Sequence, residues 1–453
     1  MKNWLSRWRH VNPDWHDWLL LLLPVAIWFS YLPNLHIGQI GGANVEFSIT
    51  EIYLVIFALT SLPLIWRQRR FLAKNRMTQA VIGGAVLVGL SLLWTSNLPR
   101  GLLTFGVIGV LVICFLAFLA NKKLPKIWPF LKSIFIASVA AMSIIAIIQV
   151  IYGIWWDFGL CSGCVATGFG FARPNVFTIE PQFFGSLLIA PMVLLIHKYL
   201  GGKAGRFDIV AMILTLFALS LTLSRGAIFA VALGVIILFI INRRNWQKIL
   251  KTIAIIAAIF AGSLVFDGAA TSLNPRVSDG FTSSIAKTVN HLSMGLIDIP
   301  VKTLTSDQPI AAPAVFDGYV KKSTTERLNM TELSLQTWRQ NAGTVIFGVG
   351  LGGSGQSIYD HTDLKWNAEI SQNQYVETLL ENGLLGLLIF LTAIGYLFYL
   401  TRRHKWLWAI LAAYLLQWNM FSGLPNALHI YLAIGLIYVT INNTYGKKIE
   451  QKH

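Results

Sequence analysis

Long apolar runs alternate with short polar connections along most of the chain. Each run is close to the ~20 residues that an α-helix needs to cross the hydrocarbon core of a bilayer. We therefore predict an all-α, polytopic membrane protein with twelve transmembrane helices. They are expected at residues 17–33, 50–66, 78–95, 101–120, 129–152, 181–199, 208–223, 226–242, 249–266, 373–400, 405–421 and 427–442.

One polar stretch, from Asp267 to Gln372, interrupts this pattern. It is rich in Ser, Thr, Asp and Lys, and none of its apolar runs is long enough to cross a bilayer. A segment of this length and polarity is usually functional or disordered. We interpret it as a half-ordered helical loop domain that covers an active site. The predicted organisation is nine helices in residues 1–266, the loop domain in 267–372, and the last three helices with a tail in 373–453.

The composition supports a membrane protein. Hydrophobic residues make up 55% of the 453 residues and charged residues only 12%, whereas soluble proteins carry about 25% charged residues. The formal net charge of +16 raises the question of nucleic-acid binding. However, most Lys and Arg residues fall in connections that share one side of the predicted topology, and most acidic residues fall on the other side. The basic excess therefore indicates topology and contact with anionic lipids, and not nucleic acid.

The positive-inside rule also orients the helices. It places both termini and the basic clusters at 67–70, 243–244 and 402–403 in the cytoplasm, and the long polar loop on the opposite side. The predicted location is the cytoplasmic membrane, with an active site on its extracytoplasmic face.

Three arginines in short outward connections, Arg100, Arg173 and Arg225, are not explained by topology. Arg225 is the clearest, because it lies in a turn between two apolar helices, at the membrane edge, where an unpaired guanidinium is costly. One interpretation is that its side chain snorkels to the lipid headgroups. The other is that it binds a phosphate, which a planar guanidinium contacts through two hydrogen bonds. The residues alone leave both interpretations open.

Several motifs, in the same order along the chain, resemble those of the O-antigen ligase and polymerase superfamily. The resemblance spans about residues 222–390, and the twelve-helix layout extends it over the whole chain. The motifs are the turn Ser224-Arg225-Gly226-Ala227, the polar helix that begins at Glu326-Arg327, the glycine-rich turn Phe347-Gly348-Val349-Gly350-Leu351-Gly352, and the helix start Asn373-Gln374-Tyr375-Val376-Glu377, followed by Glu381-Asn382-Gly383-Leu384-Leu385-Gly386.

The resemblance implies a glycosyltransferase of the GT-C type that works without a metal or other cofactor. Such proteins take a glycan from an undecaprenyl-pyrophosphate carrier and pass it to a hydroxyl of a lipid, a glycan chain or a protein. Ligases and polymerases share these motifs, so both remain open. The resemblance implies that Arg225 and Arg173 bind the pyrophosphate. Arg327 or Arg339 is expected to help from the loop, with Arg100 as a further substrate contact.

The residues suit this chemistry independently of the family. Negative charge develops on a pyrophosphate as it leaves, and preorganised arginines at the membrane edge stabilise that charge more than they would in water. The sequence has no Asp-x-Asp pair to hold a divalent ion. A hydrophobic groove between helices is expected to hold the lipid tail.

The sequence leaves the catalytic base unassigned. The family usually has a histidine just before the asparagine of the helix start, but here that residue is Gln372, whose amide does not accept a proton at useful pH. Either the base lies elsewhere, or the reaction needs positioning more than deprotonation. A lone loop histidine is more often simply solvated. The candidates are His361, Glu369, Glu377 and Glu180, which follows Arg173 in a segment that resembles the second arginine-bearing segment of the family.

Asn373, Glu377 and Glu381 share one helix face by their spacing of four residues. We expect Glu377 to pair with Arg225 or Arg173 and hold that arginine in place, a role that we favour over catalysis. Asn373 is a candidate substrate contact.

The glycine-rich turn that contains Gly348 and Gly350 follows no predicted strand, so a nucleotide-binding loop is rejected. We expect its backbone to approach a phosphate or a sugar closely.

Cys161 and Cys164 form a C-x-x-C pair in an outward connection. No second pair or close histidine accompanies them, so a small structural disulfide is favoured over a metal or redox site. Cys114 lies within a helix and is expected only to pack.

A transporter of lipid-linked glycans is the alternative function from a different class. Substrate-coupled transporters usually carry ionisable residues near the middle of the bilayer. Here the acidic residues of the predicted helices lie near helix ends, and no internal repeat is evident. This pattern favours a reaction at one membrane face over alternating access.

Overall fold

The computed structural model describes residues 11–450 except 41–42, 153–172, 274–280, 294–296, 298, 300–326, 363–370 and 421–427. Within this part of the chain, helices occupy all twelve segments that the apolar pattern predicted. They are α2 (Trp15–Ala26), α3 (Ile49–Arg67), α5 (Arg76–Leu90), α6 (Leu98–Ala120), α7 (Leu124–Tyr152), α8 (Pro181–Leu200), α9 (Arg206–Leu221), α10 (Arg225–Ile241), α11 (Trp246–Leu273), α16 (Gln374–Leu400), α17 (Trp406–Gln417) and α18 (Leu428–Glu450).

Seven of the described helices are long and apolar enough to cross a membrane, namely α3, α5 with the turn after it, α6, α7, α8, α11 and α16. The apolar parts of α2, α10, α17 and α18 are shorter. The chain is therefore a polytopic helical membrane protein, and the count of twelve spans stays a prediction.

The end of the first helix was predicted wrongly. α2 stops at Ala26, not at residue 33, because the chain turns away to meet another segment. The amides of Tyr31 and Leu32 both donate to the carbonyl of Phe177, at 3.2 Å and 2.9 Å.

A β-hairpin follows α2, and it was not predicted. β1 (Asn34–Ile40) pairs antiparallel with β2 (Ala43–Ser48), with Asn34 opposite Ser48. The sequence carried the signal, since apolar and polar residues alternate from Leu35 to Ile37 and again from Val45 to Phe47. The hairpin leads into α3, whose first turn is capped by Ser48.

The helices divide into a buried centre and a lipid-facing rim. In α8, 72% of the most apolar stretch is buried, and the helix packs against α7, α9, α10 and α17. By contrast, only 11% of the corresponding stretch is buried in each of α5, α11 and α16, as expected of helices that face lipid chains. The central core is formed by large side chains such as Trp28, Phe184 and Trp418.

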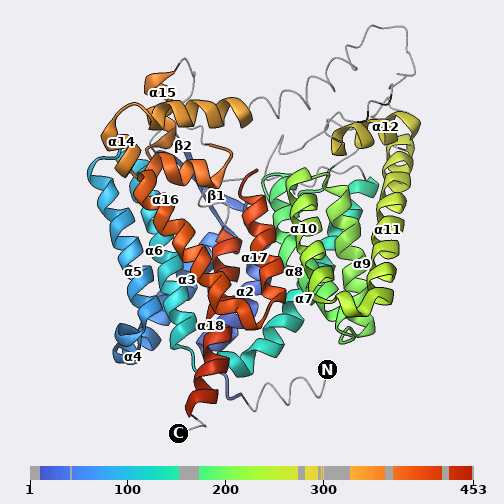
Figure 1. Ribbon diagram of the computed structural model, residues 1–453, viewed down its shortest axis with the longest axis horizontal. Coiled ribbons are helices and arrows are strands. Elements are labelled where there is room, and N and C mark those ends of the chain that lie inside the picture. The colour runs from blue at the N-terminus through green and yellow to red at the C-terminus, as the bar shows by residue number, and fades with distance from the viewer. Residues whose placement is uncertain are drawn as a thin grey trace.

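Short helices gather at one end of the bundle, which we call the loop end. α12 (Phe281–Leu292), a helix at 327–338, α14 (Ala342–Phe347) and α15 (Ser354–His361) come from the segment predicted to be a loop domain. Figure 1 shows α12, α14 and α15 above the bundle, and α4 (Arg69–Lys74) at its opposite end. α11 continues to Leu273, so it enters the predicted loop, and the three domain boundaries stay predictions.

Candidate functional site

The turn between α9 and α10 has a constrained backbone. Leu223 adopts a left-handed conformation with φ of 48°, which is uncommon for a residue other than glycine and costly for a bulky one. The amide of Ser224 donates to Thr222 Oγ1 at 3.1 Å, and Ser224 Oγ caps α10 by accepting from the amide of Ala227. The half-buried Arg225 is the first residue of α10, so this turn fixes where its side chain starts.

The segment that carries Arg173 is bonded to the same turn. Arg173 Nε donates to the carbonyl of Thr222 at 2.8 Å. Beyond it the chain is held by Gln149 of α7, whose Oε1 accepts from the amide of Val176 at 3.0 Å and whose Nε2 donates to Asn175 Oδ1 at 3.3 Å. Val176 is also left-handed, with φ of 52°. Both arginine-bearing segments therefore contain a strained residue other than glycine, a feature that clusters at functional sites.

A buried histidine joins these two segments to a third arginine. His291 of α12 is 4% exposed and donates from Nε2 to the carbonyl of Leu223 at 3.0 Å. Burial, followed by the positive charges of Arg173, Arg225 and Arg327, lowers the pKa of His291 to about 3, against a raising effect of the Leu223 hydrogen bond. The imidazole is therefore neutral, and donation to a carbonyl puts its hydrogen on Nε2.

We call Arg173, Arg225 and Arg327 the arginine cluster. Arg327 begins the helix at 327–338, and its Nη2 donates to Gln182 Oε1, in the first turn of α8, at 2.9 Å. All three guanidinium groups act electrostatically on the same imidazole, although they come from three separate stretches of the chain. The cluster can therefore present several positive charges to one anion at the loop end.

The candidate bases lie in different places. Glu180 is exposed, two residues before Gln182 in the segment that starts α8, so it lies close to the arginine cluster along the chain. His361 is exposed at the end of α15, with Nδ1 bonded to the carbonyl of Ser357 at 2.7 Å. Gln372 is half-buried just before α16. The roles predicted for all three stay predictions, and Glu369 lies outside the described residues.

Two further predicted contacts have structural roles. Asn373 caps α16, because its Oδ1 accepts from the amides of Tyr375 and Val376 at 2.9 Å and 3.2 Å. Arg339 is exposed and lies over the ring of Trp338, with 5.9 Å between the guanidinium carbon and the ring centre. Cys161 and Cys164 lie outside the described residues, and Cys114 is buried in α6.

A second group of charged side chains surrounds Glu377, and within the described part of the chain its partners are other than the expected Arg225 or Arg173. Glu377 Oε1 accepts from Ser354 Oγ at 2.6 Å, and Oε2 accepts from the amide of Ser371 at 2.8 Å. The cation that acts on Glu377 is Arg100, near the start of α6, which also acts on Glu381. The structure therefore separates the predicted site residues into two groups.

The glycine-rich turn links this second group to α6. Val349 and Gly350 donate to the carbonyls of Leu380 and Glu381, and the amide of Gly352 donates to Glu381 Oε1 at 2.8 Å. On its other side, the turn contacts the connection between α5 and α6, where Thr95 Oγ1 donates to the carbonyl of Leu351 at 2.8 Å.

Gly348 and Gly350 have positive φ, and a Cβ at either position would lie within 2.5 Å of backbone atoms of Glu381 or Thr95. The close approach that we predicted is thus to the protein's own backbone. Substrate binding by these two glycines stays a prediction.

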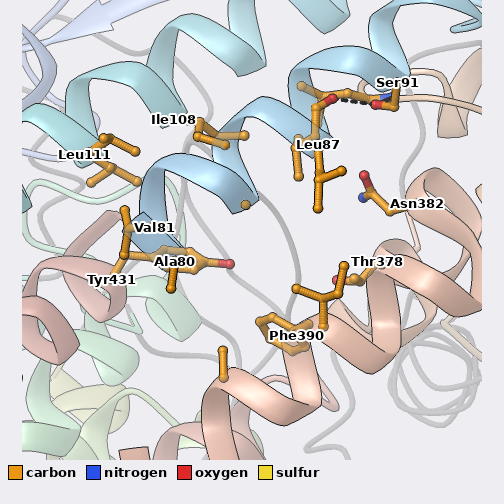
Figure 2. A pocket seen from close by; sticks show the side chains of 18 of the residues that line it. Ala80, Val81, Leu87, Ser91, Ile108, Leu111, Thr378, Asn382, Phe390 and Tyr431 are labelled. Atoms are coloured by element: carbon orange, nitrogen blue, oxygen red, sulfur yellow. Dashed lines mark hydrogen bonds between the residues drawn. The ribbon is translucent and has the colours of Figure 1, made fainter. Parts of the chain in front are cut away.

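An apolar cavity of about 1320 Å³ lies below the glycine-rich turn, between α5, α6, α16 and α18. Figure 2 shows Thr378 and Asn382 of α16 facing Leu87 of α5 and Ser91, just after α5, across it, with the ring of Tyr431 extending into the space. Arg100, Glu377 and Glu381 line its polar end. Arg173, Arg225 and Arg327 are not among the lining residues.

Comparison with known proteins finds a family match for the part of the helical bundle that runs from α9 into α16. Residues 210–391 match the family model described as O-antigen ligase. The chain carries an O-antigen ligase family domain. The resemblance proposed from the motifs is thereby confirmed for these residues, and the match supports a ligase- or polymerase-like membrane glycosyltransferase. A search of curated proteins finds no match.

The O-antigen ligase domain covers most of both groups of residues. It runs from α9 into α16 and includes Arg225, His291 and Arg327, as well as Glu377 and Glu381. Arg100 and Arg173 lie before it. The sequence analysis did not identify His291. The spacing of apolar residues in α12 is ordinary for a helix, and the carbonyl of Leu223, to which His291 donates, is far away in sequence.

His291 provides a prediction about pH dependence. A neutral buried imidazole does not take up a proton between about pH 6.5 and about 3, whereas the same group in the unfolded chain does. The free energy of unfolding should therefore fall as the pH decreases through this window, by up to about 1.4 kcal/mol per pH unit. In His291→Gln, whose amide can still donate to Leu223, this part of the pH dependence should disappear. Thermal unfolding in detergent over a pH series measures it, and equal slopes in both proteins would contradict the prediction.

Proposed function

We propose that the protein transfers a glycan from a polyprenyl-pyrophosphate carrier to an acceptor hydroxyl. The observation that carries the proposal is the arginine cluster at the loop end. Arg173 donates to the carbonyl of Thr222, next to the Leu223 carbonyl that His291 binds, and the charges of all three arginines lower the pKa of that buried imidazole. A pyrophosphate bears several negative charges, and guanidinium groups bind phosphate oxygens through paired, charge-assisted hydrogen bonds. The carrier that best fits the family is undecaprenyl pyrophosphate.

In the proposed reaction, the acceptor oxygen forms a bond with the anomeric carbon of the glycan. The bond between that carbon and the phosphate oxygen breaks, and polyprenyl pyrophosphate leaves with the electron pair. The acceptor proton passes to a base or to the departing phosphate. The arginine cluster stabilises the charge that develops on the leaving group, and such fixed electrostatic stabilisation is usually the largest single catalytic effect. We propose that these cations take the place of a divalent metal.

We further propose that the loop end faces away from the cytoplasm. The basic segment at α4 lies at the opposite end of the bundle (Figure 1), where the positive-inside rule expects cytoplasmic charge. Polyprenyl-linked glycans are then met on the outer leaflet of the cytoplasmic membrane, with both termini in the cytoplasm.

A reconstituted transfer assay tests the function. Purified protein in liposomes receives an undecaprenyl-pyrophosphate glycan, a panel of lipid, glycan and protein acceptors, and EDTA. We expect release of undecaprenyl pyrophosphate with a matching glycosylated product. The accepting molecule then separates a ligase from a polymerase. Movement of labelled carrier across the bilayer with no transfer to any acceptor would instead identify a transporter.

A further inference from the structure

Four lysines meet where α8 ends, ~30 Å along this helix from its first turn, which contacts the arginine cluster. Lys198 belongs to the last turn of α8, and the amide of Lys203, in the connection to α9, donates to the Lys198 carbonyl at 2.9 Å. Lys248 of α11 donates from Nζ to the carbonyl of Leu200 at 3.4 Å. Lys132 of α7 completes the group, because Lys198 and Lys203 both act on it electrostatically. We call these four lysines the lysine cluster.

The positive charge of the lysine cluster is mostly unbalanced. Asp208 is the only acidic residue of α8, α9 and their connection, and its Oδ1 pairs with Lys198 Nζ at 2.5 Å. Among the described residues, Lys132, Lys203 and Lys248 form no ion pair. The negative end of the α8 dipole is equivalent to only about half a charge. Three ammonium groups therefore repel one another, and a bound anion would offset this repulsion.

Burial distinguishes the lysine cluster from other basic segments of the chain. Lys132, Lys198 and Lys248 are half-buried, whereas the arginines at 69–70 and 402–403 are exposed. Exposed cations are screened by water and salt, so the positive-inside rule accounts for them without any ligand. Half-buried ammonium groups are screened less, and an anion beside them is bound more strongly. The lysine cluster therefore has the properties of an anion site.

A buried histidine nitrogen lies in the same place. His197, also in the last turn of α8, stacks on the ring of Trp406, with 4.8 Å between the ring centres. Lys203 acts on this imidazole electrostatically, as it does on Lys132. Within the described part of the chain, His197 Nδ1 is buried and has no hydrogen-bond partner. Such an atom is costly, and an anionic oxygen that accepted a hydrogen from Nδ1 would remove the cost.

The side chains around the lysine cluster favour a lipid over a free phosphate. Phe207 and Val210, in the first two turns of α9, are 55% and 52% exposed. The ring centre of Trp128 lies 6.0 Å from Lys132 Nζ, and tryptophan is typical of the membrane interface. The acyl chains of a phospholipid would cover these apolar side chains, which a free phosphate would leave exposed. Basic pockets between helices at a membrane face are known to bind anionic headgroups.

We propose that the lysine cluster binds the phosphodiester headgroup of an anionic phospholipid, with an acyl chain along the exposed face of α9. The bound lipid holds together the ends of α7, α8, α9 and α11, which supply the four lysines and Phe207. The site lies apart from the arginine cluster, and it does not rest on the proposed glycan transfer.

Two lysines of α7 supply a matched pair of variants. Lys126 is exposed and Lys132 is half-buried, so Lys126→Gln and Lys132→Gln remove the same charge from the same helix outside and inside the site. Native mass spectrometry of the detergent-solubilised full chain measures binding of phosphatidylglycerol, and of phosphatidylcholine with the same acyl chains. We expect Lys132→Gln to weaken phosphatidylglycerol binding by at least about tenfold. Lys126→Gln should stay within about twofold of the wild type, because an exposed charge contributes little. Phosphatidylcholine should bind the wild type at least about tenfold more weakly than phosphatidylglycerol.

Thermal unfolding separates a binding role of Lys132 from a structural one. Without lipid, Lys132→Gln should unfold at or above the wild-type temperature, because the substitution removes a repelling charge. Added phosphatidylglycerol should raise the midpoint of the wild type and of Lys126→Gln, and raise that of Lys132→Gln less. Inorganic phosphate at the same concentration should leave all three midpoints unchanged.

Several results would overturn the proposal. If Lys132→Gln binds phosphatidylglycerol as Lys126→Gln does, the lysine cluster is not the site. If phosphatidylcholine binds as tightly as phosphatidylglycerol, the protein holds ordinary bilayer lipid there, and if inorganic phosphate alone raises the midpoint equally, the ligand is a soluble anion. A lower midpoint of lipid-free Lys132→Gln with unchanged lipid binding would show a structural role only. None of these measurements involves glycan transfer, so they stand whatever the reconstituted assay shows.

Discussion

Arg225→Ala is expected to lower kcat/KM for glycan transfer by about 10²–10³-fold, the usual effect of removing one preorganised group that stabilises developing charge. Arg225 starts α10 from a turn whose backbone is fixed by the left-handed Leu223 and by the cap at Ser224. The backbone position from which its side chain extends into the arginine cluster is therefore fixed. The measurement is product formation in liposomes at several donor concentrations, with the folded state checked by size-exclusion chromatography.

Two further variants make this experiment specific. Arg225→Lys keeps the charge but loses the planar fork that binds phosphate oxygens in pairs, so its activity should lie between wild type and alanine. Arg206 is the matched control, because it is also the first residue of a helix, α9, but is exposed at the end of α9 that lies away from the turn with Arg225. Arg206→Ala should retain full activity. Equal losses in Arg206→Ala and Arg225→Ala would remove the arginine cluster from the mechanism.

The sequence located the helices well because crossing a bilayer imposes a length and a composition that few other structures share. It was less informative about helix ends. α2 stops early because the amides of Tyr31 and Leu32 bond to Phe177, a tertiary contact that no local pattern contains. The hairpin at β1 and β2 was overlooked although its alternation was visible, since it lies between two strong apolar runs.

The candidate site, like the fold, could be predicted from the sequence only in part. Isolated outward arginines identified Arg173 and Arg225, and the structure joins them through the turn at Thr222 and Leu223. The sequence could not tell that Arg100 belongs to a different group, because that assignment depends on the glycine-rich turn packing between α6 and α16. The expected pair between Glu377 and Arg225 or Arg173 failed for the same reason: Ser354, brought close by this packing, takes the carboxylate.

α16 is not a continuous helix, and its break explains how the glycine-rich turn is held. Gly383 has φ of 65° and ψ of −170° in the middle of the helix. A break in the helix frees carbonyl groups that would otherwise accept from amides four residues later. Here the carbonyls of Leu380 and Glu381 accept instead from the amides of Val349 and Gly350, at 2.8 Å and 3.0 Å. The break therefore joins α16 to the turn that covers the cavity.

Gly383→Ala is expected to lower the free energy of unfolding by at least about 3 kcal/mol, because the left-handed backbone strains any other residue and a clash is added. A Cβ at Gly383 would lie 2.2 Å from the carbonyl oxygen of Ile346, a backbone atom that cannot move aside alone. Gly395 of the same helix is the control, since a Cβ there meets nothing within 4 Å. Gly395→Ala should leave stability unchanged or raise it by about 0.5–1 kcal/mol. Thermal unfolding in detergent compares the two variants, and similar midpoints would show that the helix break contributes nothing to the hold on the glycine-rich turn.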